Sequence, residues 1–415
     1  MLGCDMIAAL LAYRTLLRLE HVPQIFWAAC LSRLAARMFA LAIVLYILNR
    51  FQSPELAGWM SFAALAPGLA VSPLAGALLD RIGAVQAVAL DMAAGGMLLL
   101  AIAIGGWADL LSIPALFVLV VMQSLTSPLG TAGIRVLIPQ LVPPAELDRA
   151  TALDTASYAL IDVVGPAVAG LLMGFAGPHA TMLAIAFLFL AASLALLSLM
   201  PRLAPTRATS TSSLLCQAVA GVAYVFRHHS LRGLAASYAL YQTSWGVLVV
   251  AVPVMVIERL GSGPAGDSAT GLLWAAAGIA GGVGALVAGQ ARTDRRERRF
   301  LLGGMLATAA AVAVVCLMPG LPVLALGLVL IGLSAGPVDI AVLSLRQRRT
   351  APDRLGRVMA VSMSLNLSGL PLGSVLGGVL VGVSPSLALL VAALASLLAA
   401  LCARWMIPAQ AQPSG

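Results

Sequence analysis

The chain lacks lysine altogether: all 24 basic residues among its 415 are arginines. A phosphate-binding loop of the G-x-x-x-x-G-K type requires a lysine, so this loop is absent and the sequence argues against ATP-driven pumping by the chain. Cysteine and histidine are also scarce. The cysteines show no paired spacing, and the adjacent His228 and His229 have no acidic or cysteine partner nearby in the sequence, which argues against a disulfide framework, a metal site and a catalytic constellation. We therefore expect no cofactor, no bound metal and no enzyme activity. These residues are Cys4, Cys30, Cys216, Cys316, Cys402, His21, His179, His228 and His229.

Charged residues make up only 10% of the sequence and aromatic residues 5%, whereas 61% is hydrophobic and the mean hydropathy is +1.02. The apolar runs are long enough to cross a membrane and alternate with short polar connectors. A large soluble core does not fit this pattern. A channel would need a continuous polar face through several spans, and these spans show none.

Two stretches half a chain apart are versions of one pattern, residues 138–172 and 346–380. At a fixed offset of 208 residues a polar loop and the glycine-marked apolar helix after it recur. The aligned pairs include Pro144 with Pro352, Arg149 with Arg357, Gly165 with Gly373 and Gly170 with Gly378. Apolar composition alone would not align a proline, a loop arginine and two glycines, so the sequence predicts two related halves, as in repeat-built transporters.

The hydropathy pattern predicts an all-α membrane protein of twelve transmembrane helices in two pseudo-symmetric six-helix bundles. The expected spans are 26–48, 58–79, 85–105, 111–132, 153–174, 180–200, 234–257, 269–290, 300–318, 322–343, 358–381 and 385–407. Residues 1–200 form the first bundle and residues 233–415 the second. Between them, 201–232 is a linker followed by a helix on the membrane surface.

Arginines gather in alternate connectors, and the opposite connectors hold only Arg50 and Arg259. This distribution follows the positive-inside rule, so we expect both termini and the central linker to be cytoplasmic. It also explains the net charge of +8 without a nucleic-acid partner. The expected location is the inner membrane of a bacterium.

With two six-span halves and a long central linker, the loop between spans two and three resembles the signature loop of the major facilitator superfamily, G-x-L-x-D-R-x-G. The matching positions are Gly76, Asp80, Arg81 and Gly83, after which Ala84 and Val85 replace the usual basic residues. The resemblance implies that Asp80 and Arg81 form a conformational latch of the transport cycle.

In span five, Gly165, Pro166 and Gly170 lie in a segment similar to the G-P-x-x-G-G signature of the exporter and antiporter branches, with Ala169 in place of one glycine. A bend and a close helix contact are expected there, which is also what a simple packing kink would give. Together with the segment before span seven, the resemblance is greatest to bacterial drug and siderophore exporters.

Ionisable side chains inside a membrane are costly and mark candidate functional sites. Arg33 and Arg37 lie four residues apart on one face of span one, with Arg37 near mid-membrane and Arg33 shallow enough to reach the cytoplasmic surface. Asp162 precedes the glycine–proline motif by one turn, at a depth where a carboxylate could exchange a proton. We hypothesise that Asp162, with Arg37, is the coupling site; structural ion-pair or hydrogen-bond roles are the alternatives.

Neutral polar and aromatic side chains are the candidates for a substrate cavity. They are Gln123 in span four, Tyr241, Gln242 and Trp245 in span seven and Asn366 in span eleven. Helix packing or an interfacial aromatic belt is the alternative for span seven. Three further acids, Asp91, Asp154 and Asp339, are expected to be structural, with Asp154 capping its helix or meeting Arg81 or Arg149.

These observations predict a secondary active transporter that exports a small amphipathic organic compound by alternating access, with protons as the coupling ion. An importer of a small organic metabolite, as symporter or uniporter, shares every global feature. We expect a monomer in the lipid bilayer.

Overall fold

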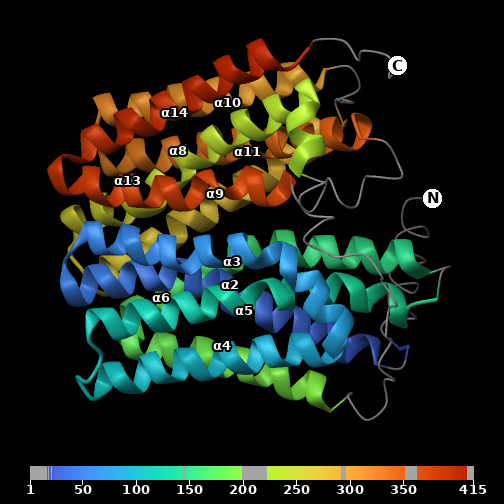
Figure 1. The fold of residues 1–415 in the computed structure, drawn as a ribbon. Coiled ribbons are helices and arrows are strands. Elements are labelled where there is room, and N and C mark those ends of the chain that lie inside the picture. Colours follow the sequence, from blue (N-terminus) through green and yellow to red (C-terminus); the bar gives the residue numbers. More distant parts are fainter. Residues whose placement is uncertain are drawn as a thin grey trace, which may run out of the picture.

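The computed structural model describes residue 16, residues 18–19 and residues 21–143, 146–198, 222–290, 296–350 and 362–408. Within these ranges the chain forms helices and connecting turns, without a strand. The helices make two bundles that pack side by side, with the first half of the chain in one and the second half in the other (Figure 1). The predicted all-helical, two-bundle fold is confirmed.

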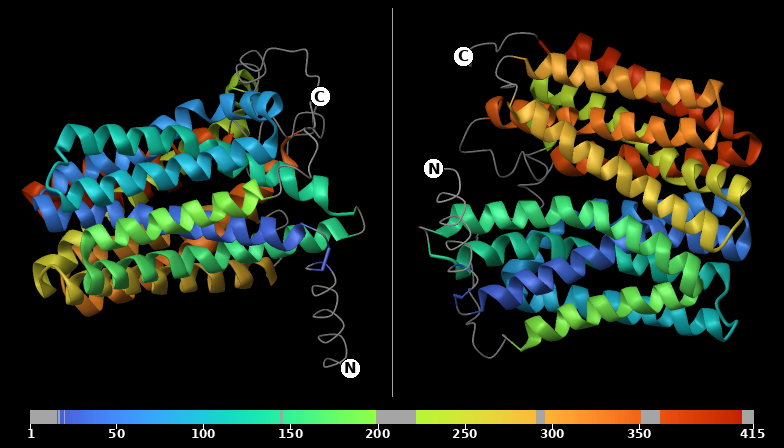
Figure 2. Two further views of the ribbon diagram at one scale, coloured as in Figure 1. Left: turned by 90° about the horizontal axis from the view of Figure 1, so that it is seen from below. Right: turned by 180° about the vertical axis from the view of Figure 1, so that it is seen from behind.

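The first bundle contains six helical spans in five elements, because the last element is a helix with two arms. They are α2 (Val22–Phe51), α3 (Pro54–Ile82), α4 (Ala84–Trp107), α5 (Ile113–Leu141) and α6 (Leu147–Leu197). The 51 residues of α6 are two helices joined at Gly177, where φ is +82° and Pro178 follows. A positive φ suits glycine, and the arms of α6 turn back on one another there (Figure 2).

The second bundle begins after the linker. It comprises α8 (His229–Leu260), α9 (Pro264–Gln290), α10 (Glu297–Leu317), α11 (Leu321–Arg348), α13 (Gly369–Val383) and α14 (Pro385–Met406). Most of the expected linker, through residue 221, lies outside the described residues. With α6 counted as two arms, every expected span has its helix.

The sequence repeat has a structural counterpart. Helix α11 begins and ends about 208 residues after α5, and α8 and α9 stand in the same relation to α2 and α3. The two bundles are therefore built from equivalent helices in the same order, as a repeat-built transporter requires.

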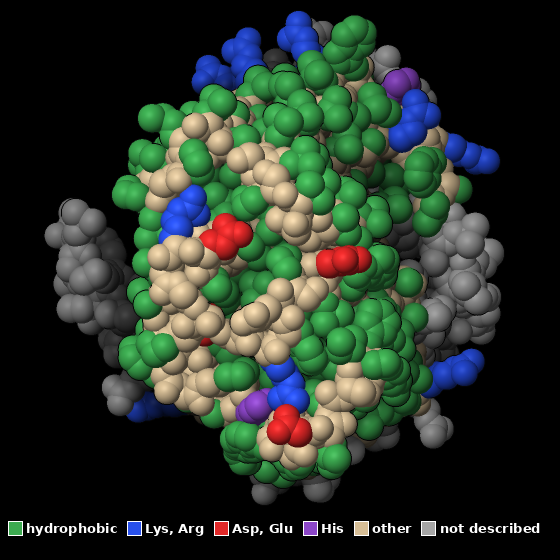
Figure 3. All heavy atoms as spheres, turned by 90° about the vertical axis from the view of Figure 1, so that its left-hand side faces the viewer, with side chains coloured by type: hydrophobic (Ala, Val, Ile, Leu, Met, Phe, Trp, Pro, Cys, Tyr) green, Lys and Arg blue, Asp and Glu red, His purple; other side chains and the backbone are tan. Residues whose placement is uncertain are grey.

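The connectors α3–α4, α5–α6 and α9–α10 lie at one end of the bundles, which we call the basic end because most of the arginines that the structure describes are there. The opposite end, drawn in Figure 3, presents apolar and backbone surface with few charged side chains. By the positive-inside rule, the connectors at the basic end lie at one membrane surface and those at the opposite end lie at the other.

The two bundles meet along α6 with α9 and α3 with α13. Glycines make this interface close: a Cβ on Gly170 would lie 2.6 Å from the backbone oxygen of Asp267, and one on Gly58 would lie 2.4 Å from that of Ser374. These contacts lie toward the opposite end, so the halves are tightly joined there.

Candidate functional site

An ion pair joins α2 to the first arm of α6. The Arg37 Nε lies 2.5 Å from Asp162 Oδ1, and the two side chains remain 50% and 46% exposed. A Cβ on Gly278 of α9 would lie 3.6 Å from the backbone oxygen of Asp162, so α6 packs against the second bundle at this residue. The two sequence-predicted coupling residues are therefore in contact with one another, beside the interface with the other half.

The glycines of the span-five motif explain this geometry. A Cβ on Gly165 would lie 2.6 Å from the Cβ of Arg37, so the absent side chain lets α6 approach α2 at the ion pair. Gly170 instead contacts Gly271 of α9, where an added Cβ would lie 2.6 Å from the Gly271 Cα. Pro166 lies between them within the helix, and its carbonyl oxygen also faces Gly271. This short motif thus makes close helix contacts both within the first bundle and between the two bundles.

Arg33 is buried, with 6% of its side chain exposed, and pairs with Asp154 at 2.6 Å. Its guanidinium also donates to Ser157 and lies 3.7 Å above the Tyr158 ring. The expectation that Asp154 meets Arg81 or Arg149 is therefore wrong. Helix α6 begins at Leu147, which sets Asp154 almost two turns into the helix and opposite α2.

Replacing Arg33 should destabilise the protein, since breaking a buried ion pair by removing one partner costs about 3–5 kcal/mol. We expect Arg33→Gln to lower the melting temperature of the purified protein clearly. The control Arg149→Gln removes a pair with Glu146 between partly exposed side chains, worth about 0–1 kcal/mol. Equal melting temperatures for the two variants would show that the Arg33 pair is not structural.

A small pocket of about 180 Å³ opens in the second bundle among α8, α11 and the segment before α13. Asp339 and Tyr238 line it, and the tyrosine hydroxyl donates to the Asp339 carboxylate at 2.6 Å. The sequence reading placed Asp339 near a helix end, but α11 continues to Arg348, so Asp339 lies more than two turns inside it. This carboxylate was missed as a site residue because the span was predicted to end at residue 343.

Asn366 lies against this pocket, and its predicted role in the substrate cavity stays a prediction. It is 2% exposed, and with its amide oxygen turned toward α11 it accepts from Arg346 at 2.5 Å. Arg346 is itself 4% exposed and also lines the pocket. The pocket thus combines one carboxylate, one guanidinium, one amide and the Tyr238 hydroxyl with apolar side chains.

Two of the predicted cavity residues lie inside a bundle instead. Gln123 is 6% exposed and packs against Gly95, where an added Cβ would lie 2.9 Å from Gln123 Oε1. Tyr241 is 1% exposed, and its hydroxyl lies 3.2 Å from the Thr308 hydroxyl of α10. Both side chains contribute to helix packing, which for Tyr241 in span seven is the alternative to substrate contact.

Trp245 is partly buried and packs against Trp274 of α9, with the ring centroids 6.0 Å apart. Gln242, beside Tyr241 on α8, is half-buried. Both stay candidates for substrate contact.

At the signature loop, Gly83 ends α3 and precedes α4 with φ of +95°, a conformation that favours glycine. Arg81 is exposed in the last turn of α3. The side chain of Asp80 and the surroundings of Gly76 lie outside what the structure describes, so the latch role stays a prediction.

A polar contact joins the two bundles at the opposite end. Asp267 of α9 is 1% exposed, and Asn49 Nδ2 of α2 lies 3.1 and 3.0 Å from its two carboxylate oxygens. No local pattern predicts this pair, because its members are 218 residues apart and belong to different bundles. It links the halves where the glycine contacts also hold them together.

Removing the Asn49 amide should destabilise the contact between the bundles at the opposite end. The buried Asp267 carboxylate would lose this hydrogen-bond donor, and an unsatisfied buried acceptor costs about 1–3 kcal/mol. We expect Asn49→Leu to melt at a lower temperature than the control Gln52→Leu, which replaces an exposed amide just beyond the same helix. The double variant Asn49→Leu/Asp267→Leu, which removes both partners, should recover part of the loss. A single variant as stable as the control would contradict this role.

Comparison with known proteins assigns the family. The Major Facilitator Superfamily model matches residues 25–290 and again residues 234–415, so it covers both bundles. The chain belongs to the major facilitator superfamily. It is accordingly a multi-pass membrane transporter rather than an enzyme.

Within the superfamily, the chain is 50% identical over 364 residues to the uncharacterized MFS-type transporter y4rN of Sinorhizobium fredii, covering 88% of this chain and 89% of the relative. It is 28% identical over 342 residues to the multidrug efflux pump Tap of Mycobacterium tuberculosis, with 79% of each chain covered. The Tap pump of Mycolicibacterium fortuitum is 26% identical over 332 residues, with coverage of 76% and 78%.

Solved structures share the superfamily fold at low identity. A bacterial homologue of the iron transporter ferroportin, in an inward-facing state, superposes with a TM-score of 0.72 at 19% identity and covers 92% of this chain and 97% of its own. The nucleoside transporter NupG gives a TM-score of 0.73 at 14% identity, with 93% and 100% covered. Similarity at this level concerns the fold.

Proposed function

We propose that this protein is a secondary active transporter that exports small amphipathic organic compounds across the bacterial inner membrane, driven by protons entering in exchange. The observation that carries the proposal is the Arg37–Asp162 ion pair, which is half-exposed and lies where α6 packs against α9 of the second bundle. An ionisable pair inside spanning helices is costly and is retained where it serves transport. The multidrug efflux pumps among the relatives support the direction of transport.

In this mechanism a proton and the substrate compete for the first bundle. With Asp162 ionised, its charge is balanced by Arg37 and the cavity can accept an organic compound. Protonation of Asp162 breaks the ion pair, frees Arg37 and favours release of the substrate on the outer side. The two halves rock about the contacts of α6 with α9 and of α3 with α13.

The second bundle supplies the remaining surface in this proposal. The pocket with Tyr238 and Asp339 provides polar groups, and Trp245 and Gln242 provide aromatic and amide contact. The basic end faces the cytoplasm, as the positive-inside rule requires. Asp80 and Arg81 act at that end as the latch, and the protein works as a monomer.

The test is accumulation of amphipathic drugs, dyes and siderophore-like compounds in cells that express the protein. Export predicts lower accumulation of some compounds than in cells with an empty vector, and loss of the difference when the proton gradient is collapsed. Higher accumulation of a compound would reveal an importer and overturn the proposal. Lower accumulation that survives collapse of the gradient would overturn proton coupling alone.

A further inference from the structure

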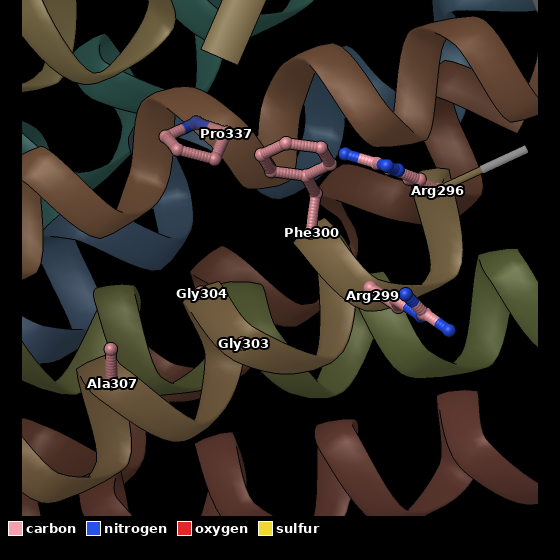
Figure 4. Close-up of a pocket in the computed structure, with 7 residues that line it drawn as sticks. All are labelled: Arg296, Arg299, Phe300, Gly303, Gly304, Ala307 and Pro337. Atoms are coloured by element: carbon pink, nitrogen blue, oxygen red, sulfur yellow. The ribbon is translucent and has the colours of Figure 1, made fainter. Parts of the chain in front are cut away.

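A groove of about 430 Å³ runs along α10 beside α11 at the basic end (Figure 4). We propose that it binds one anionic phospholipid from the membrane leaflet at that end. The headgroup phosphate would lie between Arg296 and Arg299, and one acyl chain would follow the groove past Gly303 and Ala307.

The groove follows one face of α10. The lining positions on this helix recur at intervals of three and four residues, from Arg296 just before its first turn to Ala307. At 1.5 Å rise per residue this face is about 16 Å long, comparable with the upper part of an acyl chain. Phe300 and Pro337 form its walls.

Small residues keep the groove open. A Cβ on Gly303 would meet no atom within 4 Å, so space lies directly above the helix backbone there. By contrast, a Cβ on neighbouring Gly304 would lie 2.8 Å from the backbone oxygen of Ser334, so α10 and α11 are in close contact beneath. The closely packed α10 and α11 therefore form the floor of the groove, and the space above Gly303 is empty.

The groove belongs to the apolar perimeter of the bundle. Leu306, on the same helix, is 47% exposed, and Leu286 and Val287 near the end of α9 are 70% and 61% exposed. Large apolar side chains with this exposure in a spanning helix face lipid chains. A ligand in the groove would therefore come from the bilayer.

The charge at the groove's end selects the headgroup. Arg296 and Arg299 are both exposed. Among the described residues, no acidic side chain lies within salt-bridge distance of either arginine. The nearby Glu297 pairs with Arg348 instead. Arginine guanidinium groups bind phosphate oxygens well, and basic pockets between spanning helices suit anionic headgroups. A zwitterionic lipid would place its own positive group against the same two arginines.

The experiment is native mass spectrometry of the full-length purified protein with phosphatidylglycerol or phosphatidylcholine of identical chains added. We expect the protein to retain phosphatidylglycerol preferentially. Arg296→Gln/Arg299→Gln should lower its retention by about fivefold for each arginine removed. Gly303→Leu, which fills the groove and leaves both arginines in place, should lower it as well.

Two controls are matched to these changes. Arg227→Gln removes an exposed arginine elsewhere, and Gly382→Leu adds the same side chain at another glycine with open space above it. Both should bind phosphatidylglycerol like the unaltered protein. Equal retention of the two lipids, or undiminished retention in the double arginine variant, would overturn the proposal. A loss as large in the controls would overturn it too.

Discussion

Asp162→Asn should abolish the proton dependence of export while leaving the protein in the membrane. The asparagine keeps the shape of the side chain but cannot exchange a proton, and it no longer balances the charge of Arg37. We expect the proton-driven component of transport to fall by about tenfold or more, the effect of about 1.4 kcal/mol on a rate. The measurement is substrate flux in vesicles with and without an imposed pH gradient.

The matched control is Asp148→Asn, an exposed carboxylate in the first turn of the same helix. It should transport like the unaltered protein at every pH gradient. If Asp162→Asn keeps full gradient-driven flux, Asp162 is not the coupling residue. The charge-free double variant Arg37→Gln/Asp162→Asn leaves no unbalanced Arg37 charge and should still lack coupling, which separates the effect of the unpaired arginine from the proposed transport role of Asp162.

Gly170→Val should prevent the opposite end from closing. The new side chain would begin 2.6 Å from the backbone oxygen of Asp267 and from the Gly271 Cα, and backbone on a facing helix cannot swing aside. Overpacking of a close interface costs about 1–3 kcal/mol, and about 1.4 kcal/mol shifts a two-state population tenfold. Because the cycle needs both states, we expect transport to fall to about a tenth or less.

The conformational effect can be measured directly. Spin labels at Gln52 and Ser262, one on each bundle at the opposite end, should lie farther apart in Gly170→Val than in the unaltered protein, both in a cysteine-free background. The control is Gly282→Val on α9, where an added Cβ meets no atom within 4 Å. Unchanged label distances in Gly170→Val, or the same increase in the control, would contradict the role given to this contact.

The sequence predicted the helices, their order and the division into two halves, because membrane-spanning length and the 208-residue repeat depend on composition and local pattern. Contacts between helices were harder to predict. The Arg37–Asp162 pair could be proposed because lipid makes intramembrane charges few, so each has few possible partners. The Arg33–Asp154 pair was missed because the start of α6 was placed six residues too late, which left Asp154 at the membrane surface.

The direction in which a side chain points was also difficult to predict from the sequence. Tyr238 and Tyr241 share a face of α8, yet the first lines a pocket with Asp339 and the second lies in the core against Thr308. Neighbours contributed by α10 and α11 decide this difference, and no local pattern in α8 contains them. The Asn49–Asp267 contact depends in the same way on how two separate bundles meet.

The equivalence of α2 and α8 has a consequence for engineering the protein. At the common offset, Arg33 and Arg37 of the first half correspond to Tyr241 and Trp245 of the second, so these equivalent positions hold ionic side chains in one half and aromatic side chains in the other. Under the proposed mechanism, the coupling residue Asp162 belongs to the first half, whereas the aromatic and amide contacts to the substrate come from the second half. We therefore expect directed evolution confined to the second half to change which compounds are carried while the stoichiometry of exchange stays constant.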